Sequence, residues 1–493
     1  MLKHIYAVYI TQFRRIFFNN FVWRYISAKQ IQDFFLLAAS VLFALFISGF
    51  FFITFLAYLI IFSVFNLILV RFKEQVGRKI FFAFVIVFLV LILALFKYSS
   101  FLTSGINLLA DSGFSSTISR FTPLGISYIT FQLISYFADV NSKRIEPEKS
   151  TINFLLYILY FPKLLSGPIE RGASFLHQLK HTYNFDYKIF LNGLKIFIWG
   201  FFLKSVIADR LIESVDKVFF SPSDFSSFQV FISAIFFTIQ LYTDFAGYTF
   251  MALGTSAMLG IKLTNNFRAP FFSKSISEFW TRWHITLSSW LRDYIFLPLS
   301  IKMSRTFENR NNFLNNENFI YAFASIVTMS ICGLWHGTKI TMLLWGVLHG
   351  LFLSIGFITK KQRKKIVKKL FKDKNNPALK IFRTILVLTL IIFSFVFFRS
   401  DTPDKAFSVI HSIFRPWTSF DLSGLFFIGV DTYIALTTIA FMIIVETIYY
   451  RRNLSDGSYE IHNTLNIPVI ILLIILITLF GKFGATDFIY FKF

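Results

Sequence analysis

The amino-acid sequence predicts an all-α protein that crosses a membrane many times. Of its 493 residues, 55% are hydrophobic and only 15% are charged, whereas a soluble domain typically carries about 25% charged residues. No soluble fold of this length could bury so many apolar side chains, which include 70 phenylalanines. Many apolar stretches approach the roughly 20 residues that a helix needs to cross a bilayer. We therefore expect one integral membrane domain over residues 1–493.

The apolar stretches predict about eleven to thirteen membrane-spanning helices. Residues 34–70 carry no charged side chain and are long enough for two spans, with a break near Gly49. Residues 152–165 are too short to span and contain Pro162, which favours a re-entrant segment. The other predicted spans are residues 80–96, 121–138, 189–203, 225–243, 245–261, 319–335, 340–359, 384–398, 432–450 and 465–481.

The net charge of +23 comes from basic residues that gather between the apolar stretches. Residues 360–383 hold eleven Lys or Arg against one acid, Asp373, and residues 71–79 hold four against Glu74. The positive-inside rule places both segments in the cytoplasm. The alternative for the first segment, a basic amphipathic helix on anionic lipid, places it there too. Because no aromatic-basic binding module is visible, we expect the lipid bilayer and no nucleic acid as a partner.

The N-terminus and the single cysteine narrow the class further. Residues 1–20 lack an apolar core followed by a small-residue cleavage site, so we expect no cleaved signal peptide. One cysteine, Cys332, excludes an intramolecular disulfide and a cysteine metal cluster, and its apolar neighbours favour an inert thiol. The sequence has no HExxH motif, no Walker glycine loop and no GxSxG elbow. We expect no metal in the site.

Residues 262–318 form the most unusual segment, since they are neither apolar enough to span nor polar enough for an ordinary loop. Irregular backbone at membrane depth is tolerated only where protein or a water-filled cavity surrounds it. If the chain around His284 is one helix, Trp280, His284 and Ser288 share a face at four-residue spacing. An amphipathic helix at the membrane surface would explain the same spacing.

His336 lies between two predicted spans, in a sequence where Gly333 and Gly337 flank Leu-Trp-His. Glycines let a helix or a ligand approach closely, and a neutral imidazole can take a proton from an attacking hydroxyl near pH 7. A structural histidine is the alternative. His349 follows thirteen residues later, which on a continuous helix turns it well over 90° from His336. We expect His349 to pack against a neighbouring helix.

Asp244 separates the apolar stretches 225–243 and 245–261. A carboxylate inside a membrane is costly, and it usually pairs with His or Arg or accepts backbone hydrogen bonds. Asp244 would therefore either orient a catalytic imidazole or hold the fold together. Glu170 and Arg171 are expected to form an ordinary pair at the rim.

Two motifs, Phe279-Trp280-x-x-Trp283-His284 and Gly333-Leu334-Trp335-His336-Gly337, are the most specific in the chain. With them, the sequence resembles the membrane-bound O-acyltransferase superfamily, and within it the branch that acetylates alginate, other exported polysaccharides or peptidoglycan. The stretches that carry the resemblance are residues 123–132, 161–169, 244–248, 266–293, 332–350 and 395–399, and residues 488–493 also resemble the end of that branch.

The resemblance implies a bundle of helices around a tunnel that admits an acyl thioester from the cytoplasm and an acceptor from the opposite face. His336 matches the catalytic histidine, and His284 matches the second characteristic position. The motif around Asp244 implicates that aspartate in the polysaccharide branch. Phe250 stands where this branch often has a second acid, and the first 30 residues lack its usual opening.

The same resemblance implies acetyl-CoA as the donor, which is a substrate, and no bound cofactor. Trp280, Arg282 and Trp335 are the candidate contacts for this donor. The implied acceptor is an extracytoplasmic glycan, the implied partner is a separate extracytoplasmic acetyltransferase, and the implied location is the bacterial cytoplasmic membrane. The family-like core is expected over about residues 120–400, with C-terminal helices at 401–493.

Two alternatives remain open. Within the same superfamily, the chain would transfer D-alanine to teichoic acid, or an acyl group to a lipid or a protein. In a different class, it would be a glycan or lipid transporter whose intramembrane His and Asp relay protons. Inverted repeats would favour a transporter, and none is visible in the sequence.

Overall fold

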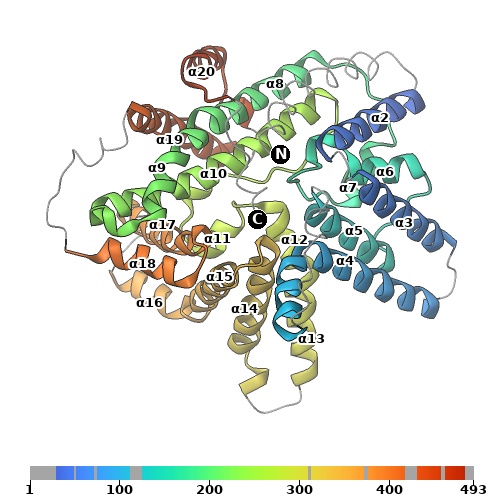
Figure 1. Cartoon of the computed structure of the whole chain (residues 1–493), viewed down its shortest axis with the longest axis horizontal. Coiled ribbons are helices and arrows are strands. Elements are labelled where there is room, and N and C mark those ends of the chain that lie inside the picture. The colour runs from blue at the N-terminus through green and yellow to red at the C-terminus, as the bar shows by residue number, and fades with distance from the viewer. Residues whose placement is uncertain are drawn as a thin grey trace. The chain divides into compact units, whose positions relative to one another are not determined.

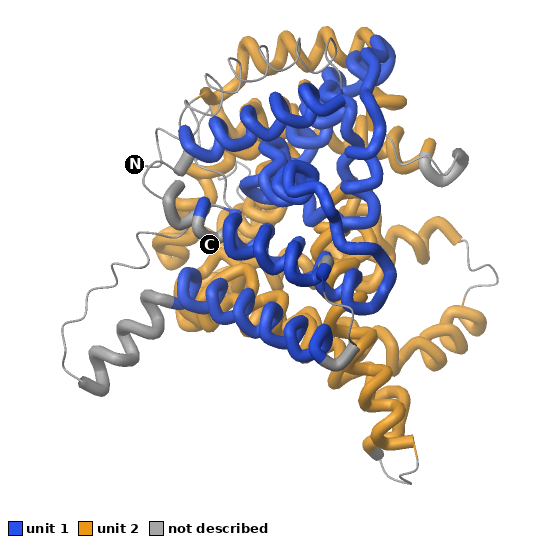
Figure 2. Tube along the Cα trace, turned by 90° about the vertical axis from the view of Figure 1, so that its right-hand side faces the viewer, with its two compact units in different colours: residues 1–197, 248–264, 484–492 blue, residues 198–247, 265–483, 493 orange. Residues whose placement is uncertain are grey.

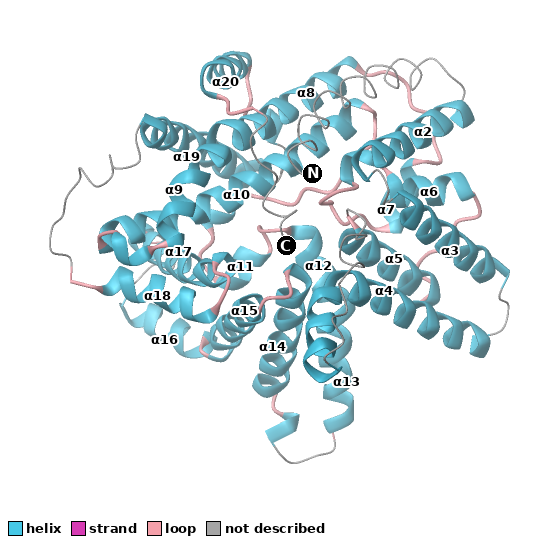
Figure 3. Cartoon of the chain, viewed as in Figure 1, coloured by secondary structure: helices cyan, strands magenta, loops and turns pink. Residues whose placement is uncertain are grey.

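The computed structural model in Figure 1 describes residues 29–48, 52–71, 75–110, 125–308, 313–370, 376–416, 430–456 and 461–483. Every regular element in these ranges is a helix and none is a strand, as Figure 3 shows. The predicted all-α class is confirmed. Gly49, Asp373 and the N-terminal residues 1–28 lie outside the described ranges, as do the closing residues 488–493.

The described chain forms α-helices joined by short connections, several of which are 3-10 or π turns. The α-helices are α2 (Lys29–Ser48), α3 (Phe52–Arg71), α4 (Gln75–Ala110), α5 (Ile126–Asn141), α6 (Thr151–Leu159), α7 (Gly172–Gln178), α8 (Tyr187–Phe202), α9 (Asp209–Phe220), α10 (Ser227–Met258), α11 (Ile276–Trp280), α12 (Ile285–Leu291), α13 (Leu297–Phe307), α14 (Glu317–His336), α15 (Ile340–Ile358), α16 (Lys360–Leu370), α17 (Pro377–Arg399), α18 (Pro403–Phe414), α19 (Val430–Asp456) and α20 (Ile467–Phe480). The turns are η3 (Phe161–Lys163), η4 (Leu203–Ala208), η5 (Pro222–Asp224), η6 (Pro270–Phe272), η7 (Arg292–Phe296), η8 (Phe313–Asn315) and η10 (Ile461–Asn463).

Eight helices within the described ranges are long and apolar enough to cross a membrane, so this is a multi-pass membrane protein. They cover Lys29–Phe46, Gly77–Tyr98, Tyr187–Phe220, Ser227–Met258, Glu317–His336, Ile340–Ile358, Pro377–Arg399 and Asp431–Arg452. Shorter apolar helices at Leu59–Leu69 and Ile467–Phe480 fall on two further predicted spans. α5 has only 16 residues, so the stretch predicted at 121–138 is short for a span in its described part.

The two spans predicted at 225–243 and 245–261 are one helix, and this prediction was wrong. α10 runs for 32 residues without a break, a rise of about 48 Å against a hydrocarbon core of about 30 Å. Asp244 does not interrupt the helix because Lys204 compensates its charge at 2.7 Å. The helix also continues through Gly247. Glycine is needed at this position because a Cβ would lie 2.8 Å from the backbone oxygen of Gly200, which packs against it.

The chain divides into two compact units, coloured separately in Figure 2. Unit 1 consists of residues 1–197, 248–264 and 484–492. Within it, α6 packs against α2, α3, α5 and α7. α6 has nine residues, too few to cross a membrane, as predicted; the re-entrant path stays a prediction. Glu170 is 1% exposed and accepts hydrogen bonds from the backbone and hydroxyl of Thr264, so the predicted rim position was wrong for this acid.

Unit 2 consists of residues 198–247, 265–483 and 493, and it holds all the candidate site residues. Its most extensive packing joins α14 and α15, two consecutive helices separated by a three-residue turn. Gly333 and Gly346 face each other across this pair, and a Cβ on either would clash with the backbone of the other helix. α15 also packs against α11 and α17. This arrangement fixes the end of α14, where His336 lies.

Candidate functional site

The segment that carries His284 is two short helices and not one. α11 ends at Trp280, and α12 begins at Ile285. His284 has φ +43° and ψ +53°, in the left-handed region. A residue in this conformation cannot continue a right-handed helix, so the predicted shared face of Trp280, His284 and Ser288 was wrong. The start of α11 has a sequence-visible cause, since Ser275 caps the backbone N–H of Glu278 at 3.1 Å.

The break at His284 is held by the irregular stretch that precedes α11. The backbone N–H of Arg268 donates to the carbonyl of Arg282, and that of Ile285 donates to the carbonyl of Asn266, both at 3.0 Å. The Asn266 side chain, fully buried, accepts from the backbone N–H and the hydroxyl of Thr286 at 3.1 and 2.6 Å. A left-handed residue other than glycine costs about 1–3 kcal/mol and persists only where its surroundings fix it. These bonds supply that restraint.

The rings of His284 and His336 lie side by side, with centroids 6.3 Å apart. Both side chains are buried, at 0% and 4% exposure. The two residues are 52 positions apart in the sequence, and helix packing in unit 2 brings them together. The structure thus joins the two motifs that were the most specific in the sequence.

Aromatic side chains enclose this pair. Trp335 packs edge-on against both rings, at 6.0 Å from His284 and 5.0 Å from His336. Trp345 and Phe398 border His336 at 5.2 and 5.4 Å, and Phe245 borders His284 at 4.7 Å. We call these four side chains, Trp335, Trp345, Phe398 and Phe245, the aromatic enclosure. Such walls lower the local dielectric, so that a proton or a partial charge on either imidazole interacts strongly with a reacting group.

Burial lowers the pKa of His284 from its ordinary value near 6.5 to about 3. The ring is therefore neutral at physiological pH and carries one N–H donor and one acceptor nitrogen. A neutral imidazole in a closed apolar site can polarise a carbonyl oxygen without adding a net charge to the site.

Asp244 belongs to a buried cluster of charges with Lys204 and Asp209. The Lys204 ammonium lies 2.7 Å from a carboxylate oxygen of each aspartate, and all three side chains are at most 3% exposed. Lys204 lies in the π turn η4 that joins α8 to α9. The next residue after Asp244 is Phe245, so the cluster holds the part of α10 that packs against His284.

His349 packs away from the histidine pair, as predicted, although the geometric reason was wrong. The helix is not continuous, since α14 ends at His336 and α15 starts at Ile340. The His349 ring accepts from the indole N–H of Trp280 at 3.3 Å and meets the hydroxyl of Ser394 at 3.1 Å. It shares Trp345 with His336, at 4.9 Å from its own ring.

The three candidate donor contacts lie in different surroundings. Trp335 touches both histidines of the pair. Trp280 packs on Trp345 and hydrogen-bonds His349, one shell further out. Arg282 pairs with Glu278 at 2.9 Å and stacks on the ring of Tyr450 at 4.9 Å. Of these three candidates, Trp335 is the one that contacts His284 and His336.

Four residues around the site were not predicted from the sequence: Lys204, Asn266, Trp345 and Phe398. Lys204 stands at the end of an apolar stretch, where a basic residue is expected to flank a span, and only the aspartate five positions later hints at a buried pair. Asn266 opens the resembling stretch 266–293, but its role depends on Thr286, twenty positions away. The two aromatic residues lie among many others, so no local signal distinguishes them.

Comparisons with known proteins give one family and several relatives. The model of the membrane-bound O-acyltransferase family matches residues 9–398, a region that begins well before residue 120. A probable alginate O-acetylase of Azotobacter vinelandii is 32% identical over 338 residues, which cover 67% of this chain and 62% of the relative. A peptidoglycan O-acetyltransferase of Helicobacter pylori is 30% identical over 345 residues, which cover 65% and 62%. A teichoic acid D-alanyltransferase of Streptococcus thermophilus is 31% identical over 287 residues, which cover 55% and 68%. The chain thus spans less than two thirds of the first two relatives.

Proposed function

The chain belongs to the membrane-bound O-acyltransferase family, and from this premise we propose that it takes an acetyl group from cytoplasmic acetyl-CoA and passes it across the membrane toward an extracytoplasmic glycan. The observation that carries the proposal is the pair of buried imidazoles, 6.3 Å apart, inside the aromatic enclosure. Acyl transfer needs a base near the acceptor and a polarising group near the carbonyl oxygen. Two adjacent imidazoles can supply both.

His336 is assigned the role of general base. As the acceptor oxygen attacks the thioester carbonyl carbon, its proton moves to the His336 ring and a C–O bond forms. The C–S bond then breaks, and the departing thiolate of CoA takes the proton from the imidazolium. General base catalysis of this kind contributes about 10²- to 10⁴-fold in rate. The remaining acceleration comes from holding the two substrates together away from water.

His284 is assigned the role of hydrogen-bond donor to the thioester carbonyl oxygen. Its low pKa keeps one N–H and no net charge on the ring at pH 7. Asp244 is assigned a positioning role, because its salt bridge to Lys204 fixes the part of α10 that carries Phe245.

The direct test uses protein purified in detergent and supplied with acetyl-CoA and an acceptor that carries free hydroxyl groups. The wild type should release CoA thiol and acetylate the acceptor. His336→Ala should lose acetyl transfer by about 10²-fold or more while it still purifies as a folded membrane protein. His349→Ala, a buried histidine one aromatic ring further from the pair, is the matched control and should lose much less. Near wild-type transfer by His336→Ala would contradict the mechanism.

D-alanyl transfer is the second candidate function. It is favoured by the similarity to the teichoic acid D-alanyltransferase, whose matched region covers 68% of that relative. The histidine pair would serve the same attack on a thioester carbonyl, with a D-alanyl thioester in place of acetyl-CoA. Supplying the two donors to the same preparation distinguishes them. Turnover of the D-alanyl thioester together with no use of acetyl-CoA would favour this second function.

We further propose that the chain hands its acetyl group to a separate extracytoplasmic transferase, which modifies the polymer. A polymer acetylated at many sites cannot easily reach imidazoles that are at most 4% exposed. The test is reconstitution in vesicles made of lipids of the bacterial cytoplasmic membrane, with acetyl-CoA inside and glycan outside. Dependence of polymer acetylation on a second secreted or membrane-anchored protein supports the relay. Efficient acetylation by this chain alone would rule it out.

A further inference from the structure

A helix outside the matched family region packs on the segment that carries His284. The family match ends at residue 398, and α19 begins at Val430. The buried side chains of α19 recur every three or four residues, so one face of this apolar span meets the protein. They include Ala435, Ile439, Met442, Val445, Glu446 and Tyr449. Glu446 is an acid in this set, and an ionisable residue within a membrane span is costly and usually has a function.

The partner of Glu446 is a hydroxyl group on α10. The phenol of Tyr242 donates a hydrogen bond to the Oε1 atom of the Glu446 carboxyl group. The two side chains are 1% and 4% exposed, and both belong to unit 2. A buried hydrogen bond between groups 204 positions apart fixes both side chains in one arrangement. Tyr242 therefore cannot turn its ring without losing this bond.

The ring of Tyr242 packs on the segment between α10 and His284. It meets Phe271 at 4.9 Å, Phe267 at 5.5 Å and Trp283 at 6.0 Å between ring centroids. Phe267 and Trp283 also contact each other at 5.2 Å. Trp283 is the residue directly before His284. The hydrogen bond from Tyr242 thus orients a group of rings that ends beside the left-handed break.

α19 contacts the same segment a second time, one turn beyond Glu446. The ring of Tyr450 stacks on Phe272 with centroids 5.0 Å apart and an angle of 13° between the planes. The guanidinium of Arg282 lies over the Tyr450 ring at 4.9 Å, a favourable position for a cation. Phe272 precedes α11 and Arg282 follows it. α19 therefore holds the segment on both sides of this short helix.

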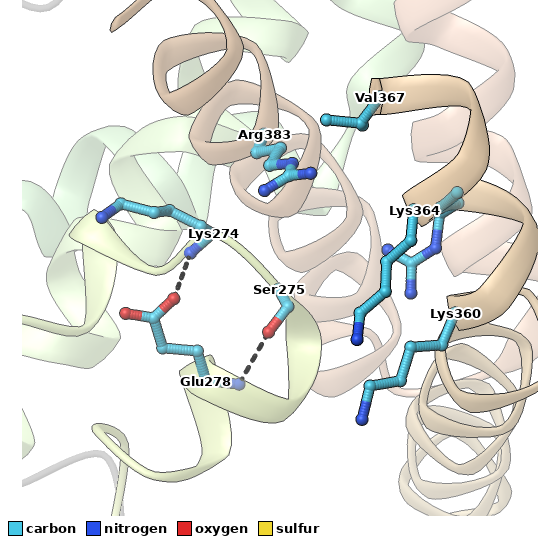
Figure 4. A pocket seen from close by; sticks show the side chains of 8 residues that line it. Lys274, Ser275, Glu278, Lys360, Lys364, Val367 and Arg383 are labelled. Atoms are coloured by element: carbon cyan, nitrogen blue, oxygen red, sulfur yellow. Dashed lines mark hydrogen bonds between the residues drawn. The ribbon is translucent and has the colours of Figure 1, made fainter. Parts of the chain in front are cut away.

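α11 is also fixed at its start, so the short helix and its flanks behave as one piece. Figure 4 shows that the hydroxyl of Ser275 accepts from the N–H of Glu278, and that the Glu278 carboxylate accepts from the N–H of Lys274. The same carboxylate pairs with Arg282 at 2.9 Å. Lys274 to Arg282 are thereby tied together, and a displacement of this piece reaches the break two residues later.

We propose that Glu446 is a positioning residue of the acyltransferase site, which acts through Tyr242 to hold His284 where its N–H meets the thioester carbonyl oxygen. This inference rests on the role of His284 in the proposed function. It gives α19, outside the matched region, a part in the reaction. Orientation matters because a displacement of about 1 Å in a reacting group can cost about 10²-fold in rate.

The experiment separates this role from a contribution to stability. Replacing both partners of a buried hydrogen bond by apolar groups of the same shape is nearly neutral for stability, whereas removing one leaves the other unpaired. The test variant is therefore Tyr242→Phe/Glu446→Met, which keeps the ring and fills the space of the glutamate. Glu446→Gln is the conservative variant, because its amide oxygen can still accept from Tyr242. For each purified protein, the unfolding midpoint and the kinetics of acetyl transfer are measured.

The test variant should keep the unfolding midpoint of the wild type and lose kcat by about 10- to 100-fold. The KM for acetyl-CoA should stay unchanged, because the lost interaction belongs to the transition state. Glu446→Gln should retain most of kcat. A normal kcat in Tyr242→Phe/Glu446→Met, or the full loss in Glu446→Gln, would overturn the inference while leaving the proposed function intact.

A second measurement shows whether the loss passes through His284. His284→Gly removes the imidazole, and glycine fits the left-handed conformation. Adding Tyr242→Phe/Glu446→Met to His284→Gly should reduce the residual transfer little further, since both changes disable the same group. Equal fold-losses with and without the imidazole would reveal a general structural effect and overturn the inference. This comparison decides the question even if the test variant is less stable than the wild type.

Asp431→Asn is the matched control on α19. Asp431 lies at the start of this helix, where it pairs with Arg210 and Lys482. Its replacement should lower the unfolding midpoint and leave kcat unchanged. A fall in kcat as large as that of the test variant would show that any weakening of α19 impairs the reaction, against the inference. If the wild type uses neither acetyl-CoA nor a D-alanyl thioester, the proposed function fails and the inference fails with it.

Discussion

At the scale of single residues, the two histidines depend on different backbone devices. His284 stands at a left-handed break between α11 and α12. The neighbouring backbone groups are fixed there, because the Arg282 carbonyl accepts from Arg268 and the Ile285 N–H donates to Asn266. His336 ends a helix that cannot shift along its partner, because Gly333 and Gly346 interlock. The rings meet because both devices are rigid. A change in either one displaces a ring without altering its chemistry, which makes the supporting residues as testable as the histidines.

The low pKa of His284 predicts a pH dependence of stability. The folded chain keeps the ring neutral down to its pKa of about 3, whereas an unfolded histidine takes up a proton near pH 6.5. Between these values the unfolded state binds the extra proton. Stability should therefore fall on acidification below pH 6.5, by at most about 1.4 kcal/mol per pH unit.

The measurement is the thermal unfolding midpoint in detergent at pH 7 and pH 5. His284→Asn is the reference, because asparagine does not titrate and tolerates the left-handed conformation. The wild type should lose more stability than His284→Asn over this interval. The same loss in both proteins would show that another group governs the acid response.

The buried charge cluster predicts an order of severity among its variants. Lys204→Met leaves the carboxylates of Asp209 and Asp244 buried without their cation, and removing one partner of a buried pair costs about 3–5 kcal/mol. Asp244→Asn leaves one lysine opposite one aspartate and should cost less. Unfolding of the purified variants checks the order. A larger loss for Asp244→Asn than for Lys204→Met would show that the aspartate has a second essential role.

At the scale of elements, the hairpin of α14 and α15 is the support on which His336 depends. A side chain at Gly333 would meet the backbone oxygen of Met342. Gly333→Ala should therefore push the helices apart and destabilise the chain by about 1–3 kcal/mol, the usual cost of overpacking. Gly356 lies on the same α15 with nothing within 4 Å of its would-be Cβ.

Gly356→Ala is the matched control for this prediction. It should be neutral or stabilising by up to about 1 kcal/mol, because alanine is the better helix former. Thermal unfolding and acetyl transfer are measured together for both variants. Gly333→Ala with normal stability and normal transfer would show that the hairpin is free to separate.

At the scale of the whole molecule, the charge bias predicts an orientation in the membrane, and the fold makes that orientation testable. α14 and α15 have 20 and 19 residues, a rise of about 30 Å each and close to the hydrocarbon thickness. We therefore expect the two ends of this pair to lie on opposite faces of the membrane. α16 follows at the end predicted to be cytoplasmic, and the turn after His336 lies at the other end.

Cysteine labelling from outside intact cells tests this orientation. Thr338→Cys, exposed in the turn, should react with a membrane-impermeant reagent, and Lys361→Cys, exposed on α16, should not. The native Cys332 is fully buried and should add little background. Labelling at Lys361→Cys together with protection at Thr338→Cys would reverse the orientation and place α16 outside the cell.

The sequence by itself determined the helical class, the membrane setting, most span positions and the family. It also selected the two histidines that the structure brings together, and their catalytic role stays a prediction. Hydropathy and charge report what each stretch must do with lipid and water, and short motifs carry local rules such as the cap at Ser275. These are properties of neighbouring residues, so a one-dimensional pattern contains them. The predicted spans at 80–96, 319–335, 340–359, 384–398 and 432–450 each coincide with a described helix for this reason.

Only the tertiary structure decided how distant residues compensate one another. α10 continues through Asp244 because Lys204 approaches from a π turn forty residues earlier. The break at His284 exists because Asn266 holds it, and the end of α14 that carries His336 is held because α14 and α15 interlock. Each of these outcomes depends on a contact between segments whose spacing in the sequence carries no periodic signal. A buried charge or a strained residue is costly alone and is tolerated only with its partner. The local sequence therefore predicts a break at Asp244 and a continuous helix through His284. In both places a contact between distant segments produces the opposite result.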